Sequence, residues 1–525
     1  MSRVLSTLAI AALLAGAGGD RLAQRGPASA AASPRPARAA APAPGLPPFA
    51  LFGWLSPPSE STSAARMREL AGAGLGVALS AWGDSGRAAD NLRRIRFAAD
   101  CGVRCLVWDE RFDRVYNHGA DPALLDTIVA DYANEPGFLG YSFTDEPQPA
   151  EFPLLARIYS DLRQRDPGHP AWDNLLGMSS FPDLAAWESY VRAFVDAVHP
   201  RVLCVDLYDF LAGRDQGLFV RNVAALRGLA DEYSLPFWFI VQLVQHGPYR
   251  ALTVGELRWQ VSHLLAYGAR GAGYFTYWTP APDPEWNWQP AVIGYDGRRT
   301  AWYDVLASFN PRVRAAGETL AALTWLSTQH AGSVPGGGAA FVPDDWIRDV
   351  DGRAALGRFA GGAGGRYLLV ANSDSLAART VTLSLPRTRR ILRLGDASGS
   401  WSEVGTGREL GGVRARVALD SGGFALLQLE ADPGAAPGPV LAVGPNPARG
   451  AVRFAVSRIG AGARLEIVDS GGRRVWSRAL EPGAALATWS GEREGGGRVR
   501  PGIYLARVSD AGGVTTARVS WLGAR

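Results

Sequence analysis

The sequence contains no lysine, so all 54 of its basic side chains are arginine, against 50 acidic side chains. The arginines are spread along the chain instead of gathering in basic runs, although the formal net charge is +4. A nucleic-acid-binding surface needs such a cluster. The charge pattern therefore argues against a nucleic-acid partner.

Cysteine and histidine are also scarce, which bears on disulfides, metals and cofactors. Cys101, Cys105 and Cys204 are the three cysteines, an odd and low count that predicts free thiols and no disulfide framework. A single Cys101–Cys105 bridge is the alternative. The six histidines do not combine with cysteines at the spacing of metal ligands, so no metal site is expected. Glycine-rich segments lie between expected strands, which predicts hairpin loops and no phosphate-binding cofactor site.

Long hydrophobic runs are absent after the N-terminus. Residues 1–19 combine Arg3, an apolar run and small residues, the pattern of a secretory signal peptide that is too short for a membrane span. A Pro/Ala-rich linker is expected over residues 20–48. We therefore expect an exported protein, secreted or at the cell surface, with no membrane span.

Short apolar runs alternate with amphipathic segments over residues 49–323. Expected strands occupy residues 49–54, 76–82, 104–110, 138–144, 171–177, 202–208, 236–243 and 271–278. Strands that alternate with helices indicate a parallel sheet. Eight such units in roughly 270 residues predict a (β/α)₈ TIM barrel, which typically takes about 250 residues. A doubly wound sheet is the runner-up.

The helical period disappears after the expected barrel. Alternating strands between Gly/Asp/Ser turns predict an accessory β-sandwich over residues 324–430, with structural support as its expected role. Residues 431–440 form an expected linker. A second all-β unit follows over residues 441–525, close in size to an immunoglobulin-like domain.

Polar and aromatic residues are concentrated where the expected strands end, which is the active-site end of a TIM barrel. Asp145, Glu146 and Asp206 are the candidate catalytic carboxylates. The candidate substrate-binding residues are Trp54, Trp82, Trp108, Asn174, Tyr208, Gln242, Gln245, Tyr274, Tyr277 and Trp278. Aromatic faces pack against sugar rings, and glycoside hydrolysis needs carboxylates in pairs. The set predicts a carbohydrate substrate, although aromatics that fill the barrel and carboxylates that cap helices would produce a similar pattern.

The segment GYSFTDEP, residues 140–147, resembles the Asn-Glu-Pro or Asp-Glu-Pro signature of (β/α)₈ glycoside hydrolases of clan A. VDLYDF (residues 205–210) resembles the sixth-strand element of family 42-like members, and GARGAGYFTYWTP (residues 268–280) resembles their eighth strand. The resemblance implies that Glu146 is the general acid/base. It also implies that a Tyr and a Trp of the eighth strand form the floor of a sugar site.

The expected seventh strand departs from that pattern, because it offers Gln242 and Gln245 where retaining members carry a nucleophilic Glu. Three hypotheses follow. In the first, another acid is the partner of Glu146: Asp206, Asp209, Glu110 or Glu285. In the second, Asp145 orients the acetamido group of an N-acetyl sugar while Glu146 protonates the leaving oxygen, as in families with an adjacent Asp-Glu pair. In the third, the barrel is a non-catalytic carbohydrate-binding or structural surface protein.

The second hypothesis sets a condition on the backbone. Neighbouring residues of a regular strand point to opposite faces, so Asp145 and Glu146 can act together only where the strand has ended. Pro147 makes such an end plausible.

The C-terminal unit resembles the FlgD-like immunoglobulin-type domain, whose relatives include C-terminal sorting domains of type IX secretion. The matching features are Pro445-Asn446-Pro447, the VDSGGRRV hairpin, Trp489, Gly491 and the PGIYLARV strand. Ser490 stands where that family usually has Asp, and the terminal lysines of the family are absent. The resemblance implies secretion machinery as a partner, and a passive spacer is the alternative.

Overall fold

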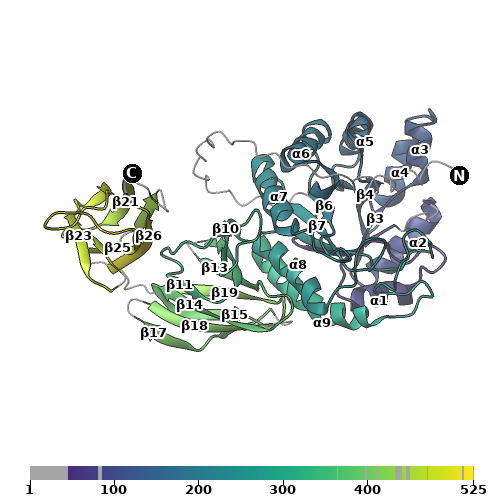
Figure 1. Ribbon diagram of the computed structural model, residues 1–525. Coiled ribbons are helices and arrows are strands. Elements are labelled where there is room, and N and C mark those ends of the chain that lie inside the picture. The colour runs from purple at the N-terminus through teal and green to yellow at the C-terminus, as the bar shows by residue number, and fades with distance from the viewer. Residues whose placement is uncertain are drawn as a thin grey trace.

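The computed structural model describes residues 45–80, 86–362, 365–395, 399–409, 412–431, 440–444, 448, 450–469, 471–510 and 513–523. Figure 1 shows a helix-covered sheet at the N-terminal end of this part, a β-rich middle and a smaller β unit at the C-terminal end.

Parallel strands and helices alternate over the first half of the described chain. The strands are β1 (Ala50–Gly53), β2 (Val77–Leu79), β3 (Arg104–Val107), β4 (Phe138–Asp145), β5 (Ala171–Asn174), β6 (Leu203–Leu207), β7 (Phe237–Gln242) and β8 (Gly271–Phe275). The helices are α1 (Ala64–Gly72), α2 (Ala88–Ala99), α3 (Glu110–Tyr116), α4 (Leu124–Tyr132), α5 (Phe152–Arg165), α6 (Leu184–Val198), α7 (Phe219–Tyr233), α8 (Val254–Ala266) and α9 (Ala301–Ala321).

These strands form one eight-stranded sheet in the order β5-β4-β3-β2-β1-β8-β7-β6. A parallel bridge between Leu175 and Val205 joins the two ends of the sheet, and the Leu175 N–H donates to the Cys204 carbonyl at 2.9 Å. The sheet is therefore a barrel closed at its last seam by a short contact. The predicted (β/α)₈ barrel is confirmed.

Aromatic side chains fill the barrel interior. Phe52, Trp172 and Trp238 are almost fully buried, and their ring centroids lie 5.6–6.3 Å apart. Two glycines of β8 make room for them, because a Cβ at Gly271 would meet the Trp238 ring and one at Gly273 would meet the Phe52 ring. The interior is a packed core, so a substrate can reach only the ends of the strands.

The chain after α9 is all-β, as predicted. A seven-stranded sheet contains β9 (Thr324–Ala331), β10 (Ala339–Ala340), β12 (Ala354–Ala360), β13 (Arg366–Asn372), β15 (Thr388–Leu394), β16 (Trp401–Glu403) and β19 (Phe424–Ala431). A four-stranded sheet contains β11 (Asp349–Asp351), β14 (Arg379–Pro386), β17 (Thr406–Glu409) and β18 (Gly412–Leu419). Buried side chains of both sheets, such as Leu356 and Leu383, share one core.

The seven-stranded sheet packs directly on α8 of the barrel. A Cβ at Gly357 would lie 2.5 Å from the Ala266 carbonyl oxygen, and the Ser262 hydroxyl donates to the Gly422 carbonyl at 2.7 Å. Phe359 and Phe424 belong to the same buried cluster as the barrel side chains. This sheet therefore covers the barrel and shares its core, as a support for the α8 side.

The C-terminal unit has its own core and two sheets. One sheet contains β20 (Val440–Gly444), β21 (Val452–Ile459) and β24 (Gly483–Trp489), and the other contains β22 (Arg464–Val468), β23 (Arg474–Ala479), β25 (Gly502–Asp510) and β26 (Gly513–Trp521). Trp489 and Trp521 lie at its centre with ring centroids 5.2 Å apart. Gly491 has a φ of +84°, and a Cβ there would meet the Trp521 ring.

The predicted FlgD-like identity of this unit stays a prediction. The first of its motifs, residues 445–447, lies outside the described residues, as do the expected signal peptide and most of the two expected linkers.

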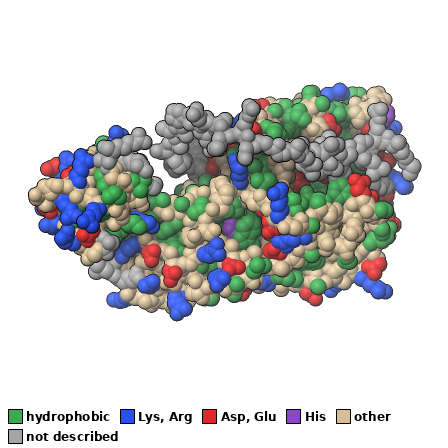
Figure 2. Space-filling view, viewed as in Figure 1, with side chains coloured by type: hydrophobic (Ala, Val, Ile, Leu, Met, Phe, Trp, Pro, Cys, Tyr) green, Lys and Arg blue, Asp and Glu red, His purple; other side chains and the backbone are tan. Residues whose placement is uncertain are grey.

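On the face shown in Figure 2, arginine side chains are interspersed with acidic ones. Within the described ranges, no helix combines the length and apolarity that a membrane crossing requires. The same ranges contain no group of three or more His, Cys, Asp or Glu side chains arranged to hold a metal ion.

Candidate active site

The site begins with an irregularity at the end of β4. Ser142 is opposite Trp172 and Asp145 is opposite Asn174, so β4 carries one residue more than β5 between the two pairs. This is a β-bulge, which re-aims the side chains that follow it. Beyond it, the Asn174 side-chain amide donates to the Asp145 carboxylate at 3.1 Å.

Glu146 leaves the strand in an unusual backbone conformation, with a φ of +52°. This left-handed geometry costs a residue other than glycine about 1–2 kcal/mol, so its neighbours must hold it. The Glu146 N–H donates to the Asn174 carbonyl at 2.8 Å, and the Tyr190 hydroxyl of α6 donates to the Pro147 carbonyl at 2.8 Å. The condition set by the sequence is met, because regular alternation has ended before Glu146.

Three carboxyl groups meet at this point. A hydrogen bond joins the side chains of Glu146 and Asp206, which ends β6, and the charge of Asp206 also acts on Asp145. The side chains of Asn174 and Tyr208 also lie beside Asp206. The sequence-predicted catalytic residues Asp145, Glu146 and Asp206 therefore lie in one cluster at the carboxyl end of the barrel.

The cluster holds protons that isolated carboxyl groups would release. Burial raises the pKa of Glu146 to about 10, with the charges of Asp206 and Asp145 as further causes. Burial and the charge of Asp206 raise the pKa of Asp145 to about 8. Burial also raises the pKa of Asp206, although hydrogen bonds from Tyr208 and Asn174 oppose the rise. At neutral pH Glu146 and Asp145 therefore both hold a proton, because each pKa lies above 7.

An aromatic wall stands beside the carboxyl cluster. The ring centroid of Tyr208 lies 5.0 Å from that of Phe275, and the His246 ring stacks on Trp288 at 4.7 Å. Trp286 stacks on Trp288 in turn at 5.8 Å. Trp286 and Trp288 come from the loop after β8, and both side chains are half-buried.

Gln242 at the end of β7 is fully buried, and its amide is engaged by the backbone. Its side-chain oxygen accepts from the Phe210 N–H at 3.1 Å, and its nitrogen donates to the carbonyls of Phe210 and Arg250 at 3.2 and 3.1 Å. These bonds tie β7 to the loop after β6. Gln245, by contrast, is exposed.

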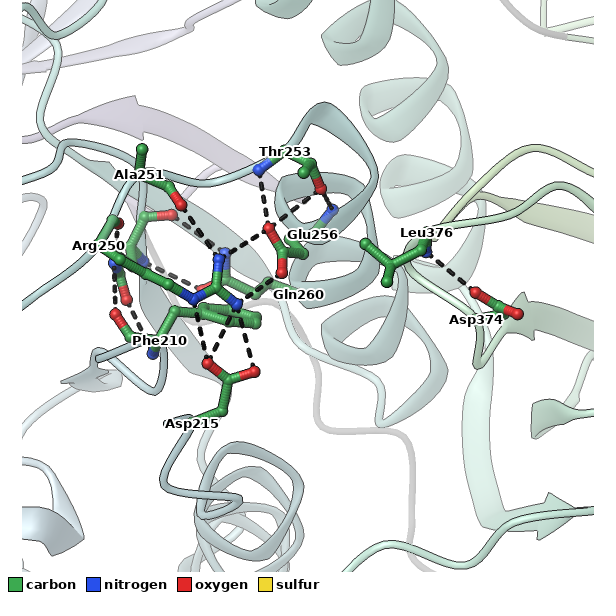
Figure 3. Close-up of polar contacts among 10 residues, drawn as sticks. Phe210, Asp215, Arg250, Ala251, Thr253, Glu256, Gln260, Asp374 and Leu376 are labelled. Atoms are coloured by element: carbon green, nitrogen blue, oxygen red, sulfur yellow. Dashed lines mark hydrogen bonds and ion pairs between the residues drawn. The ribbon is translucent and has the colours of Figure 1, made fainter. Parts of the chain in front are cut away.

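An arginine latch holds the same loops together (Figure 3). Arg250 pairs with Asp215 at 3.0 Å and with Glu256 at 2.6 Å, and its guanidinium lies 5.0 Å from the Phe210 ring centroid. Glu256 and Thr253 form a capping box at the start of α8. The latch fixes the loop that carries Tyr249, whose ring lies 5.4 Å from that of Tyr208.

Other predicted binding residues lie away from the cluster. Trp54 packs on Trp172 in the layer below the mouth. Tyr274 is fully buried and donates to Asn310 of α9 at 2.6 Å, so its side chain lies on the outer side of the barrel. The Tyr277 hydroxyl is buried within electrostatic reach of Glu69 of α1.

Three further predicted residues complete the set. Trp278 lies under the guanidinium of Arg66 at 5.2 Å. Trp108 follows β3 and is half-buried, and Trp82 lies outside the described residues.

The other acids considered as partners of Glu146 have different roles. Asp209 accepts from the Leu218 N–H at 2.8 Å and so shapes the loop after β6. Glu110 begins α3 and Glu285 lies in the loop after β8, and both are exposed.

Sequence patterns missed several residues of the site. Asp173 accepts from the Thr144 N–H at the bulge, and Tyr190 and Tyr249 complete the surroundings of the carboxyls. Asp173 lies within an expected strand, between Trp172 and Asn174, which face the barrel interior. An acidic residue at that outward-facing position was the sequence signal that could have identified it. Tyr190 comes from a helix and Tyr249 from a loop, where the spacing of residues in the sequence does not indicate their position relative to the site.

The chain was compared with known proteins. No family model matches it, and no curated protein matches it. A β-galactosidase from Bacillus circulans sp. alkalophilus shares 10% identity over 73% of this chain and 99% of its own, with a TM-score of 0.46. A glucosidase from Croceicoccus marinus shares 11% identity over 84% and 93%, with a TM-score of 0.36. A family 5 glycoside hydrolase, a mannosidase from Rhizomucor miehei, shares 9% identity over 52% and 94%, with a TM-score of 0.37. These similarities are distant, so the function has to be argued from the site itself.

Proposed function

We propose that this protein is a glycoside hydrolase in which Glu146 is the general acid. The observation that carries the proposal is the hydrogen-bonded pair of Glu146 and Asp206, with Asp145 beside it, at the carboxyl end of a (β/α)₈ barrel. A general acid in glycoside hydrolysis needs a raised pKa so that it holds its proton at working pH. Glu146 meets this requirement because burial and its carboxylate neighbours raise its pKa to about 10.

The second catalytic group distinguishes between mechanisms. A retaining pair of carboxyls keeps about 5–5.5 Å between its members and an inverting pair about 6.5–9.5 Å. The hydrogen-bonded pair Glu146–Asp206 is closer than either spacing. Gln242, at the end of the seventh strand, carries no carboxylate and uses its amide for backbone contacts. Both observations favour a route in which the nucleophile belongs to the substrate.

In that route the substrate is a 2-acetamido sugar. The acetamido oxygen attacks the anomeric carbon, the glycosidic bond breaks, and the leaving oxygen takes the proton of Glu146. Asp145, whose pKa is raised to about 8, acts in its ionised form above that pH: it accepts the acetamido N–H and stabilises the positive charge of the oxazolinium ring. Water then attacks the anomeric carbon as Glu146 recovers a proton from it, and the ring reopens to the acetamido group. Asp206 orients Glu146 through the hydrogen bond between their side chains.

The surrounding side chains support a saccharide ligand. Aromatic faces pack on the apolar faces of sugar rings, and Trp286 and Trp288 present half-buried faces next to His246. Burial lowers the pKa of His246 to about 4, so this ring is neutral at working pH and adds no positive charge to the wall.

The test is a panel of chromogenic glycosides in matched pairs, with a 2-acetamido or a 2-hydroxyl group on the same sugar. We expect turnover on a 2-acetamido member, and we expect Glu146→Gln to lower kcat by about 10²–10⁴. Glu285→Gln is the matched control, because Glu285 is exposed in the loop after β8. Turnover confined to 2-hydroxyl substrates would contradict the substrate-assisted route and leave hydrolysis in place. Saccharide binding without any turnover would favour the alternative of a non-catalytic carbohydrate-binding barrel. Gln242 supports that alternative, because it stands where retaining members carry a nucleophilic Glu.

We also propose that the chain is exported. The apolar run in residues 1–19 and the FlgD-like resemblance of residues 441–525 support this. Expression of the full chain and of a chain ending at Gly438 in a host with type IX secretion separates the two signals. Equal extracellular yield would contradict a sorting role for the C-terminal unit.

A further inference from the structure

We propose that Asp173 is a positioning residue for the reaction, because it holds the β4 bulge that turns Asp145 and Glu146 toward the same side. The inference rests on the proposed function for its kinetic test, and a second test below needs no substrate. Asp173 would not touch the sugar, and its effect would pass through the backbone of β4.

Asp173 lies on the outer face of β5. Its neighbours Trp172 and Asn174 face the barrel interior, and its own side chain is 3% exposed and points toward α5. One carboxylate oxygen accepts the Thr144 N–H at 2.8 Å, and the other accepts the Tyr159 hydroxyl of α5 at 2.8 Å. Burial raises the pKa of the Asp173 carboxyl to about 7, and the N–H groups of Thr144 and Phe143 act against this rise. This buried acid therefore accepts one hydrogen bond from the bulge of β4 and one from α5.

The bulge creates the need for this acceptor. Phe143 and Thr144 stand opposite Asp173 alone, so the ladder with β5 cannot supply one carbonyl for each of their N–H groups. A buried N–H without an acceptor costs about 1–3 kcal/mol. The Asp173 carboxylate removes that cost. Without it, a regular ladder becomes competitive, and regular alternation would place Asp145 and Glu146 on opposite faces.

A second contact extends the same support to Glu146. Asn174, the next residue of β5, accepts the Glu146 N–H through its carbonyl and donates to Asp145 through its side chain. Asp173 and Asn174 thus both contact the end of β4: Asp173 bonds Thr144, and Asn174 bonds Asp145 and Glu146. Their adjacency couples the outer face of the barrel, at α5, to the carboxyl cluster inside.

Two substitutions of Asp173 test whether its role is to accept hydrogen bonds. Asp173→Asn keeps an oxygen for the Thr144 N–H and offers an N–H to the Tyr159 oxygen, so the bulge should survive. Asp173→Ala removes both. We expect kcat of Asp173→Ala to fall about 10²-fold, with KM within about threefold, since a shift of about 1 Å in a catalytic group costs that much. Asp173→Asn should retain kcat within about threefold.

Two kinetic outcomes would overturn the proposal. An unchanged kcat in Asp173→Ala would show that the bulge does not depend on Asp173. A collapse of kcat in a folded Asp173→Asn would show that the charge, and not the acceptor, matters. The second outcome is readable even where Asp173→Ala fails to fold, because the amide is the conservative replacement.

The second test follows the position of Glu146 without a substrate. A double-mutant cycle measures the midpoint of thermal unfolding between pH 5 and 9 for wild type, Glu146→Gln, Asp173→Asn and the variant that combines both changes. A second cycle uses Asp173→Ala in place of Asp173→Asn. Titratable side chains that face Glu146 are Asp145, Asp206, Tyr190, Tyr208 and Tyr249. In wild type and Asp173→Asn, Glu146→Gln should raise the midpoint increasingly with pH. In Asp173→Ala that pH-dependent gain should disappear, since Glu146 would leave both its buried position and Asp206.

The two tests fail independently. A persistent gain in Asp173→Ala overturns the positioning role, whatever the enzyme does. If wild type shows no turnover, the proposed hydrolase function is contradicted. If the pH-dependent gain from Glu146→Gln is nevertheless lost in Asp173→Ala, the proposal that Asp173 positions Glu146 still holds.

Discussion

The carboxyl groups of Glu146 and Asp206 are joined by a hydrogen bond, although they end two strands, β4 and β6, that are separated in the barrel by β5. Such a bond requires a proton on one partner, because two ionised carboxylates at this distance repel each other. The pair therefore keeps a proton on Glu146, whose pKa is raised to about 10. An acid that gives up this proton to a leaving oxygen can take it back from water.

Replacement of Glu146 by Gln should stabilise the protein at neutral and alkaline pH. The pKa of Glu146 is raised to about 10 in the folded chain, so between about pH 4.5 and 10 the folded state keeps a proton that the unfolded state releases. Wild-type stability therefore falls as pH rises through this window, and the amide has no such loss. We expect a gain of about 1–2 kcal/mol at pH 8 and none at pH 4, measured by guanidinium unfolding with tryptophan fluorescence. An equal gain at both pH values would contradict the shared proton.

Introduction of a carboxylate at Gln242 should not create a retaining nucleophile. Gln242→Glu loses the donors to the carbonyls of Phe210 and Arg250 and places a buried charge against both. We expect a loss of about 3 kcal/mol or more in the free energy of unfolding and no gain in turnover. Gln245→Glu is the matched control, because Gln245 is exposed three residues later and should tolerate the charge. A stable Gln242→Glu protein with increased turnover would show that the seventh strand can still supply the second carboxylate.

The barrel was predictable because its signals are periodic. Apolar runs that end in polar and aromatic residues, separated by amphipathic segments, specify parallel strands and covering helices without any knowledge of contacts. The same logic placed Asp145, Glu146 and Asp206 at one end of the barrel. Strand direction alone brings such residues to a common rim.

The orientation of individual side chains was less accessible to sequence analysis. Period-two alternation places Asp145 and Glu146 on opposite faces, and only the bulge at Phe143–Thr144 and the positive φ of Glu146 change this. Tyr274 is one residue from the barrel-facing Phe275, and its hydroxyl bonds Asn310 of α9 on the outer side. The extent of the expected third strand also differed, because Glu110 begins α3 and β3 ends at Val107. One extra residue in a strand, or a helix that begins early, changes the direction in which the following side chains point. Amino-acid composition does not reveal such a change.

Truncation of Trp288 should weaken substrate binding more than chemistry. Its ring stacks on His246 and Trp286 and so belongs to the aromatic wall, on which we expect a sugar ring to pack. We expect Trp288→Ala to raise KM about tenfold for an oligosaccharide, with kcat within about threefold, in line with about 0.5–1.5 kcal/mol for an aromatic contact beyond its buried area. Trp401→Ala, in the seven-stranded sheet, controls for the loss of an indole as such. Equal KM values for the two variants would remove Trp288 from the substrate path.

Loss of the Arg250 latch should loosen the loops after β6 and β7 in a pH-dependent way. Arg250 bonds both Asp215 and Glu256 through a planar fork that the single ammonium of lysine cannot reproduce. Burial alone would raise the pKa of Glu256, but hydrogen bonds from Arg250 and Thr253 bring it below its ordinary value. A carboxyl with a lowered pKa stabilises the fold above about pH 4.5, and this contribution is lost as pH falls further.

Arg250→Met and Arg250→Lys should therefore both cost about 1–3 kcal/mol at pH 7 and much less at pH 3. They should also raise KM, because the loop that carries Tyr249 would lose its anchor. Arg214→Ala is the matched control, since Arg214 is exposed on the same loop as Asp215. Full rescue by lysine would mean that charge alone holds the loops. An equal cost at pH 3 and pH 7 would assign the effect to packing of the arginine stem on Phe210 instead of to Glu256.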